Sequence, residues 1–166
     1  MKLLDATVLE ELMRSGTSEG PNIPETYDCI NLQSFTHIAT DAKTLSALAK
    51  YTQKAVRESG CILDLSALEE ISPAVLLVFL RGERIDYILF AALRRLDLGS
   101  ARMLVGAIHK GMSWINFGIG FELSNLGPDV LAELFTSTRY GWTEDGKFHL
   151  FGEQVFLDYE EDGYLA

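Results

Sequence analysis

Cysteine is scarce in this sequence. Only Cys29 and Cys61 are present, too few for a disulfide framework, and neither belongs to a CxxC or Cys/His spacing of the kind that holds zinc. The three histidines, His37, His109 and His149, lie far apart, and none has a second ligand at helical or hairpin spacing. We therefore expect a reducing compartment, no metal site and no cofactor.

Long apolar runs are missing as well. Charge interrupts every apolar stretch well before the roughly 20 residues that a membrane helix needs. Acidic residues also fall inside the N-terminal stretch, where a signal peptide would have its apolar core. The sequence therefore predicts a cytoplasmic protein that neither spans a membrane nor is secreted.

Basic residues are outnumbered: 14 Lys and Arg face 24 Asp and Glu, for a formal net charge of -10. Such a charge repels phosphate backbones and anionic lipids, so we expect no direct contact with nucleic acid or with membrane. Two explanations of the acidity remain open, namely solubility alone and complementarity to a basic protein partner. Charge is uneven, because residues 81 to 111 hold six basic residues against three acids.

Length and composition indicate one folded domain. The 166 residues are 48% apolar and 23% charged, as in ordinary globular proteins. We divide the chain into an N-terminal helix (Asp5 to Ser15) with its linker over residues 1–26, an α/β domain over 27–140, and a C-terminal hairpin with an acidic tail over 141–166. The last part is expected to pack on the same domain.

Strand and helix patterns alternate through the central part of the chain, which predicts an α/β fold with a mostly parallel or mixed sheet and helices packed against it. No internal repeat is recognised. Residues 87–93 could also continue the preceding helix, and we favour a strand. The expected strands are 27–32, 61–65, 87–93 and 114–123, followed by a hairpin of 147–151 and 154–159 around Gly152. The expected helices are capped at Thr40 or Asp41, at Ser72 and at Ser100, and a fourth is opened by Pro128.

Catalytic motifs are also lacking. Gly118-Ile119-Gly120 lacks the third glycine of a dinucleotide loop and precedes a strand pattern, so we expect a bulge or close packing there. Glu69 and Glu70 are adjacent in a loop, where carboxylates are usually solvated. The sequence therefore predicts no catalytic residues and no enzymatic activity.

One segment resembles a known family. Cys61-Ile-Leu-Asp-Leu-Ser-Ala-Leu-Glu-Glu-Ile-Ser-Pro-Ala-Val-Leu-Leu-Val-Phe79 is similar to the central motif of STAS domains, the sulfate-transporter and anti-sigma-factor-antagonist family, in which a buried strand leads through a short loop into a helix. The resemblance implies a STAS-like domain that acts by protein contact, near the start of the Ser72 helix. The chain departs from the family where phosphorylated members have Asp-Ser, because Ser72-Pro73 stands there.

Two functions follow as alternatives. The first is a non-enzymatic regulatory or adaptor domain of a bacterial cytoplasm, which contacts its protein partner near Glu69, Glu70 and Ser72. The second is an acidic inhibitor, of the immunity or phage anti-defence type, that blocks a basic nucleic-acid-binding surface of a partner protein. Its candidate contact residues lie in the acidic C-terminal stretch: Asp158, Tyr159, Glu160, Glu161, Asp162 and Tyr164.

Overall fold

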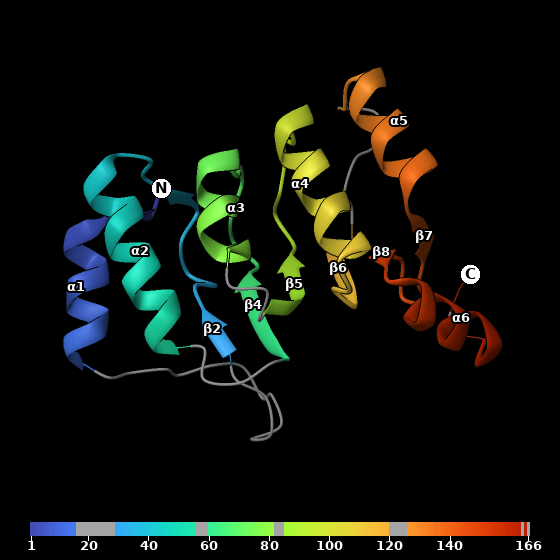
Figure 1. The fold of residues 1–166 in the computed structure, drawn as a ribbon, viewed down its shortest axis with the longest axis horizontal. Coiled ribbons are helices and arrows are strands. Elements are labelled where there is room, and N and C mark those ends of the chain that lie inside the picture. The colour runs from blue at the N-terminus through green and yellow to red at the C-terminus, as the bar shows by residue number, and fades with distance from the viewer. Residues whose placement is uncertain (16–28, 56–59, 82–84, 120–125, 164, 166) are drawn as a thin grey trace.

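The computed structural model describes residues 1–15, 29–55, 60–81, 85–119, 126–163 and 165. These form an α/β fold, as expected (Figure 1). Along the chain the elements are β1 (Leu3–Leu4), α1 (Ala6–Ser15), β2 (Cys29–Asn31), β3 (His37–Ile38), α2 (Ala42–Ala55), β4 (Cys61–Leu65), α3 (Pro73–Leu80), β5 (Ile85–Phe90), α4 (Leu98–His109), β6 (Trp114–Ile119), α5 (Pro128–Ser137), β7 (Arg139–Trp142), β8 (Lys147–Phe151) and α6 (Glu153–Glu161).

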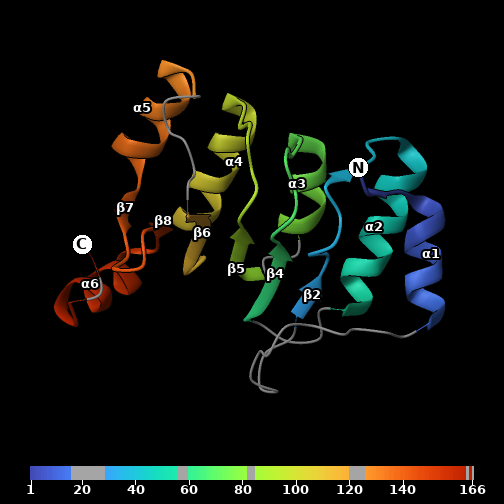
Figure 2. The ribbon, with the colours of Figure 1, turned by 180° about the vertical axis from the view of Figure 1, so that it is seen from behind.

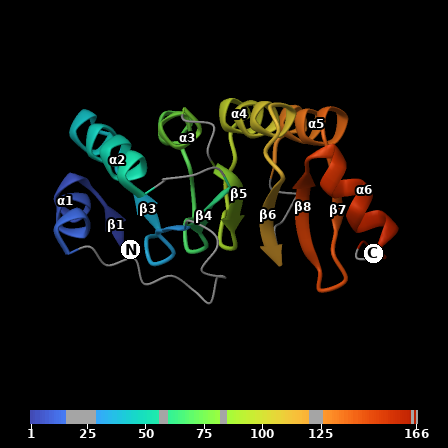
Figure 3. The same ribbon diagram turned by 60° about the horizontal axis from the view of Figure 1, so that its bottom comes forward.

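The main sheet is mixed and follows the chain order closely. Its strand order is β2-β4-β5-β6-β8-β7, in which the first four strands are parallel to one another and β8 runs antiparallel to both of its neighbours, β6 and β7 (Figure 2). Helices α2 to α5 lie on one side of this sheet (Figure 3). β1 pairs with β3 in a separate two-stranded sheet, and Leu4 and Leu9 are fully buried, so the N-terminal arm packs on the core.

Each of the four parallel strands forms a strand–helix unit with the next helix along the chain, and these units are stacked side by side. The units are β2 with α2, β4 with α3, β5 with α4, and β6 with α5. Ile30, Leu63, Ile88 and Ile115 stand opposite one another in the register, and all are buried beneath the helices. Helices pack in the same order, α1 on α2, α2 on α3, α3 on α4 and α4 on α5. Each unit therefore contacts mainly its neighbours, as in solenoid proteins. This internal repeat was not recognised in the sequence, because the matched residues are 33, 25 and 27 positions apart.

One local turn recurs in the parallel strands. In three of the four parallel strands, an Asn or Asp side chain accepts a hydrogen bond from the backbone N–H two residues later, the Asx turn that these residue types favour. The acceptors are Asn31 (3.1 Å, from Gln33), Asp64 (3.0 Å, from Ser66) and Asn116 (2.7 Å, from Gly118). Asn31 and Asp64 lie at the ends of β2 and β4, whereas Asn116 lies inside β6, at the register shift between β6 and β8.

Side-chain caps start the helices. Asp41 accepts from the N–H of Thr44 at 3.0 Å, and Ser72 accepts from that of Val75 at 3.2 Å, so both predicted caps are confirmed. The predicted cap at Ser100 is wrong. Asp97 caps α4 instead, and Ser100 is buried inside the helix, where its hydroxyl donates to the backbone carbonyl of Ile71 at 3.3 Å.

The apolar patterns of strand 61–65 and of the Ser72 helix predict four core residues, Ile62, Leu63, Leu76 and Leu77, and the prediction is correct for two of them. Leu63 and Leu76 are fully buried, whereas Ile62 is only half-buried and Leu77 is exposed. Alternate residues of a strand face opposite sides, and the helices cover the side that carries Leu63. Leu77 lies on the outer part of α3, where no described element covers it.

The C-terminal part differs from the predicted hairpin. A hairpin does form, but its strands are β7 and β8, and residues 154–159 belong to helix α6. Phe156 and Tyr159, three residues apart on one helical face, both pack on Phe151, with ring centroids 5.9 and 5.3 Å away. A strand could not place both rings on that side chain.

The first predicted strand, 27–32, forms over residues 29–31, and the strand predicted at 114–123 is confirmed over its described residues, 114–119. The strand predicted at 87–93 forms as β5 over residues 85–90, and residues 91–93 lie outside it. The predicted linker, residues 27 and 28, and residues 120–123 lie outside the described part. Gly118 lies at a register shift between β6 and β8 with a φ of +79°, which confirms the expected bulge. No described helix combines the length and the apolar character needed to cross a bilayer.

Candidate functional site

Glu69 and Glu70, two predicted contact residues, lie in the loop between β4 and α3, where they take part in contacts between units. The Nε2 atom of His37 is 3.8 Å from a carboxylate oxygen of Glu69 and 3.9 Å from one of Glu70. On the other side, the guanidinium of Arg94 is 3.6 Å from Glu69. These side chains come from three successive units, so their contacts run across the stack.

Backbone hydrogen bonds join the same loops. The N–H of Glu69 donates to the carbonyl of Thr36 at 3.0 Å, and the N–H of Arg94 donates to that of Glu69 at 2.8 Å. Ser72 follows this loop, and its hydroxyl is engaged in capping α3. The described contacts therefore give these loop residues a structural role. Their role in partner binding stays a prediction.

The predicted acidic contact residues are placed by α6, at the opposite end of the sheet from β2 (Figure 1). Asp158 accepts a hydrogen bond from Gln154 at 3.2 Å, and the ring of Tyr159 is half-buried against Trp114 and Phe151. Glu160, Glu161 and Asp162 are exposed, and Tyr164 lies outside the described residues. The two predicted sets of contact residues are thus not brought together.

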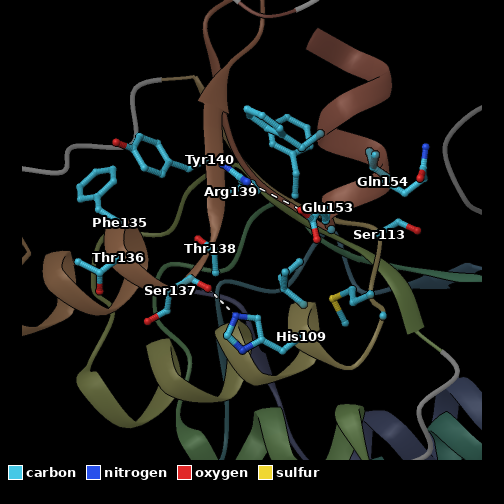
Figure 4. A pocket seen from close by; sticks show the side chains of 17 residues that line it. His109, Ser113, Phe135, Thr136, Ser137, Thr138, Arg139, Tyr140, Glu153 and Gln154 are labelled. Carbon is cyan, nitrogen blue, oxygen red and sulfur yellow. Dashed lines mark hydrogen bonds and ion pairs between the residues drawn. The ribbon is translucent and has the colours of Figure 1, made fainter. Parts of the chain in front are cut away.

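One hollow on the surface, about 830 Å³, lies among the ends of α4 and α5 and the start of α6 (Figure 4). Several of its polar side chains serve other contacts. A ring nitrogen of His109 contacts the backbone carbonyl of Ser137, and Arg139 is 3.8 Å from Glu153 while lying over the ring of Phe156. Among the described residues, His109 therefore meets a backbone carbonyl in this hollow and not a hydroxyl that it could activate.

A second hollow, about 680 Å³, lies between α3 and α4. We call it the α3–α4 groove. Apolar side chains from both helices line it, chiefly Leu77 and Leu80 of α3 and Met103 and Ala107 of α4. Leu77 is 48% exposed, whereas Val75, Leu76 and Phe79 of the same helix are buried in the core.

Three cations surround the α3–α4 groove. Arg81, Arg102 and Lys110 all line it and are all exposed. Arg102 is 3.9 Å from Glu133 of α5, so it is partly neutralised. Among the described lining residues Asp86 is the one acid, and its carboxylate accepts hydrogen bonds from the hydroxyl of Ser113 at 2.8 and 2.9 Å. The groove is thus locally positive on a chain whose net charge is -10.

Sequence reasoning noted the basic excess of residues 81–111 but did not find this groove. The cations come from two helices, and only the packing of α3 against α4 brings them to one hollow. The sequence does hold one indication of the groove. Leu77 stands four positions before Arg81, so an apolar and a basic side chain share one face of the helix.

The thiols and metal-binding residue types suggest no further chemistry. Burial, and secondarily the carboxylate of Asp64, raises the pKa of Cys29 to about 11, so this thiol stays protonated and unreactive near neutral pH. Within the described residues, no three His, Cys, Asp or Glu side chains come together as metal ligands would.

Comparison with known protein families, with curated proteins and with solved structures finds no match for this chain. The groove and its charges are therefore the basis for any functional conclusion.

Proposed function

We propose that this chain is a non-enzymatic adaptor or regulatory domain that binds a protein partner through the α3–α4 groove. The observation that carries the proposal is the exposure of Leu77 within a hollow rimmed by Arg81 and Lys110. An apolar floor with a polar rim is the usual anatomy of a protein contact. The cations favour a partner segment in which carboxylates flank an apolar side chain.

The size of the groove suits a peptide or a helix face better than a large flat interface. An amphipathic helix that lies in a groove is held by apolar anchors at a spacing of three and four residues. The resemblance to STAS domains also implies contact through the helix that Ser72 begins, and this helix supplies Leu77 and Arg81.

A second candidate is an acidic inhibitor of a basic protein. It is favoured by the exposed acids of α6, which holds no basic residue to neutralise them. In that case the partner would contact α6 and would leave the groove empty, so the two candidates differ in the surface that they use.

A photo-crosslinking amino acid at Leu77 tests the proposal, with the same amino acid at Lys50 of α2 as the matched control. Both positions are exposed on helices. After irradiation in extract of the source cells, we expect a defined protein crosslinked at position 77 but not at 50, and we expect Arg81→Gln/Lys110→Gln to abolish it. Equal labelling at the two positions, or a partner captured only from a probe at Leu157, would exclude the groove.

A further inference from the structure

The α3–α4 groove has a complementary surface on the same chain. We infer that the groove binds α6 of a second copy of this chain, so that copies associate head to tail. This inference rests on the proposed function of the groove as a protein-binding site and names its partner.

The outer face of α6 carries an apolar side chain among acids. Leu157 is 48% exposed, as Leu77 is. Glu160 and Glu161 follow three and four residues later and thus share the face of Leu157, and Glu153 precedes it by four. Glu153 is 3.8 Å from Arg139, which leaves Glu160 and Glu161 as the acids best able to meet an external cation.

The inner face of α6 is already occupied. Phe156 and Tyr159 pack on Phe151, and Tyr159 also contacts Trp114 with ring centroids 6.0 Å apart. These contacts keep the helix on its own sheet. Leu157 therefore projects from a helix that needs no rearrangement before it binds, which lowers the ordering cost of association.

The two surfaces match in chemistry, since each presents an exposed leucine beside charges of opposite sign. Leu157 would lie against Leu77, while Glu160 and Glu161 would approach Arg81 and Lys110. Exposed ion pairs add little free energy and are screened by salt, so burial of the two leucines supplies affinity and the charges supply orientation. The net charge of -10 makes copies repel each other and so weakens their association. We therefore expect copies to associate only at high protein concentration.

Within one chain the two surfaces cannot meet. Helix α6 contacts β7 and β8 at the edge of the sheet, whereas the groove lies between α3 and α4 (Figure 1). The contact would join different surfaces of the two copies, a heterologous interface. Each copy can then use its groove for one neighbour and its α6 for another, which builds open chains or rings.

Sedimentation velocity over a range of concentrations tests the inference with two variants. The groove variant is Arg81→Gln/Lys110→Gln, and the helix variant is Leu157→Gln/Glu160→Gln/Glu161→Gln. Matched controls make similar charge changes elsewhere, at exposed residues of α2 (Lys50→Gln/Lys54→Gln) and α1 (Glu10→Gln/Glu11→Gln). We expect wild type and controls to grow in average mass with concentration, and each test variant to associate at least about tenfold more weakly.

Mixing the two test variants gives the sharpest outcome. The helix variant keeps an intact groove and the groove variant keeps an intact α6, so the mixture has one functional contact and should stop at dimers. A wild-type chain that stays monomeric at every soluble concentration, or test variants that associate like the controls, would overturn the inference. The proposed function would survive a monomeric result if the probe at Leu77 still captures a different protein. Capture of this chain's own residues 153–162 would support both.

Discussion

The imidazole of His149 lies parallel to the indole of Trp114, with ring centroids 5.2 Å apart and planes inclined by 17°. Phe151 stacks near the same imidazole at 5.2 Å and 20°. His149 is buried in this aromatic group, and its Nδ1–H donates to the carbonyl of Lys147 at 3.1 Å. Burial lowers the pKa of His149 below the ordinary value of 6.5, because the charged ring loses its hydration.

This lowered pKa predicts a pH-dependent stability. As the pH falls below about 6.5, the unfolded chain takes up a proton at His149 that the folded chain binds less readily, so the free energy of unfolding decreases. Urea denaturation at pH 7.5 and 5.5 measures the decrease. His149→Phe should reduce it, and His37→Gln, at a half-buried histidine, serves as the control. A decrease of the same size in the His149→Phe variant would contradict the prediction.

Two glycines should respond in opposite ways to substitution by alanine. A Cβ at Gly118 would lie 2.9 Å from the Cα of Ala91, and the φ of +79° is unfavourable for other residues. Gly118→Ala should therefore cost at least about 2 kcal/mol of stability. Gly106 lies inside α4 with nothing within 4 Å of a Cβ, and Gly106→Ala should add about 0.5–1 kcal/mol. Thermal denaturation followed by circular dichroism compares them.

Ser72 should contribute to stability through its cap. Its side chain accepts from the N–H of Val75, so Ser72→Ala should lower the free energy of unfolding by about 1 kcal/mol. Ser72→Asp retains an acceptor at the same position and should lose much less. Chemical denaturation of both variants measures the two losses of unfolding free energy. Equal losses in Ser72→Ala and Ser72→Asp would contradict the capping role of Ser72.

Cys29 should react slowly with alkylating reagents. A pKa of about 11 in place of the ordinary 9.0 reduces the thiolate fraction at pH 8 by about a hundredfold. Mass spectrometry of the Cys29 peptide after timed exposure to iodoacetamide measures the rate, and the denatured chain provides the unperturbed reference. Asp64→Asn should raise the native rate, because this carboxylate disfavours a nearby thiolate; native and denatured rates that agree would refute the assignment.

Local signals in the sequence predicted many of the elements but not how they face one another. Ser72-Pro73 marks the start of α3 by cap chemistry that needs no neighbour, and that prediction is confirmed. The apolar runs around Ile62 and Leu77 do not reveal which side chains point inward. Pairing of β4 with β2 and β5, and the packing of α3 between α2 and α4, decide this.

The errors at the C-terminus and in the repeat have related causes. Residues 154–159 hold apolar side chains that suit a strand or a helix, and the aromatic contacts of Phe156 and Tyr159 with Phe151 select the helix. The repeated units share buried positions in the register while differing in length, so no fixed period is visible. The groove depends on the same stacking, because its cations belong to two successive units.

Sequential stacking has a consequence for how the molecule opens. Since contacts join mainly adjacent units, an end unit can detach without disturbing the centre, whereas β4 and β5 lie between partners on both sides. Amide hydrogens of those two strands should exchange with solvent last, and exchange should proceed from the edges inward. At one edge, the antiparallel pair β8 and β7, with α6 packed against it, then slows fraying of the sheet. At the other edge, β2 is held by α2 and by the N-terminal arm that packs on α2.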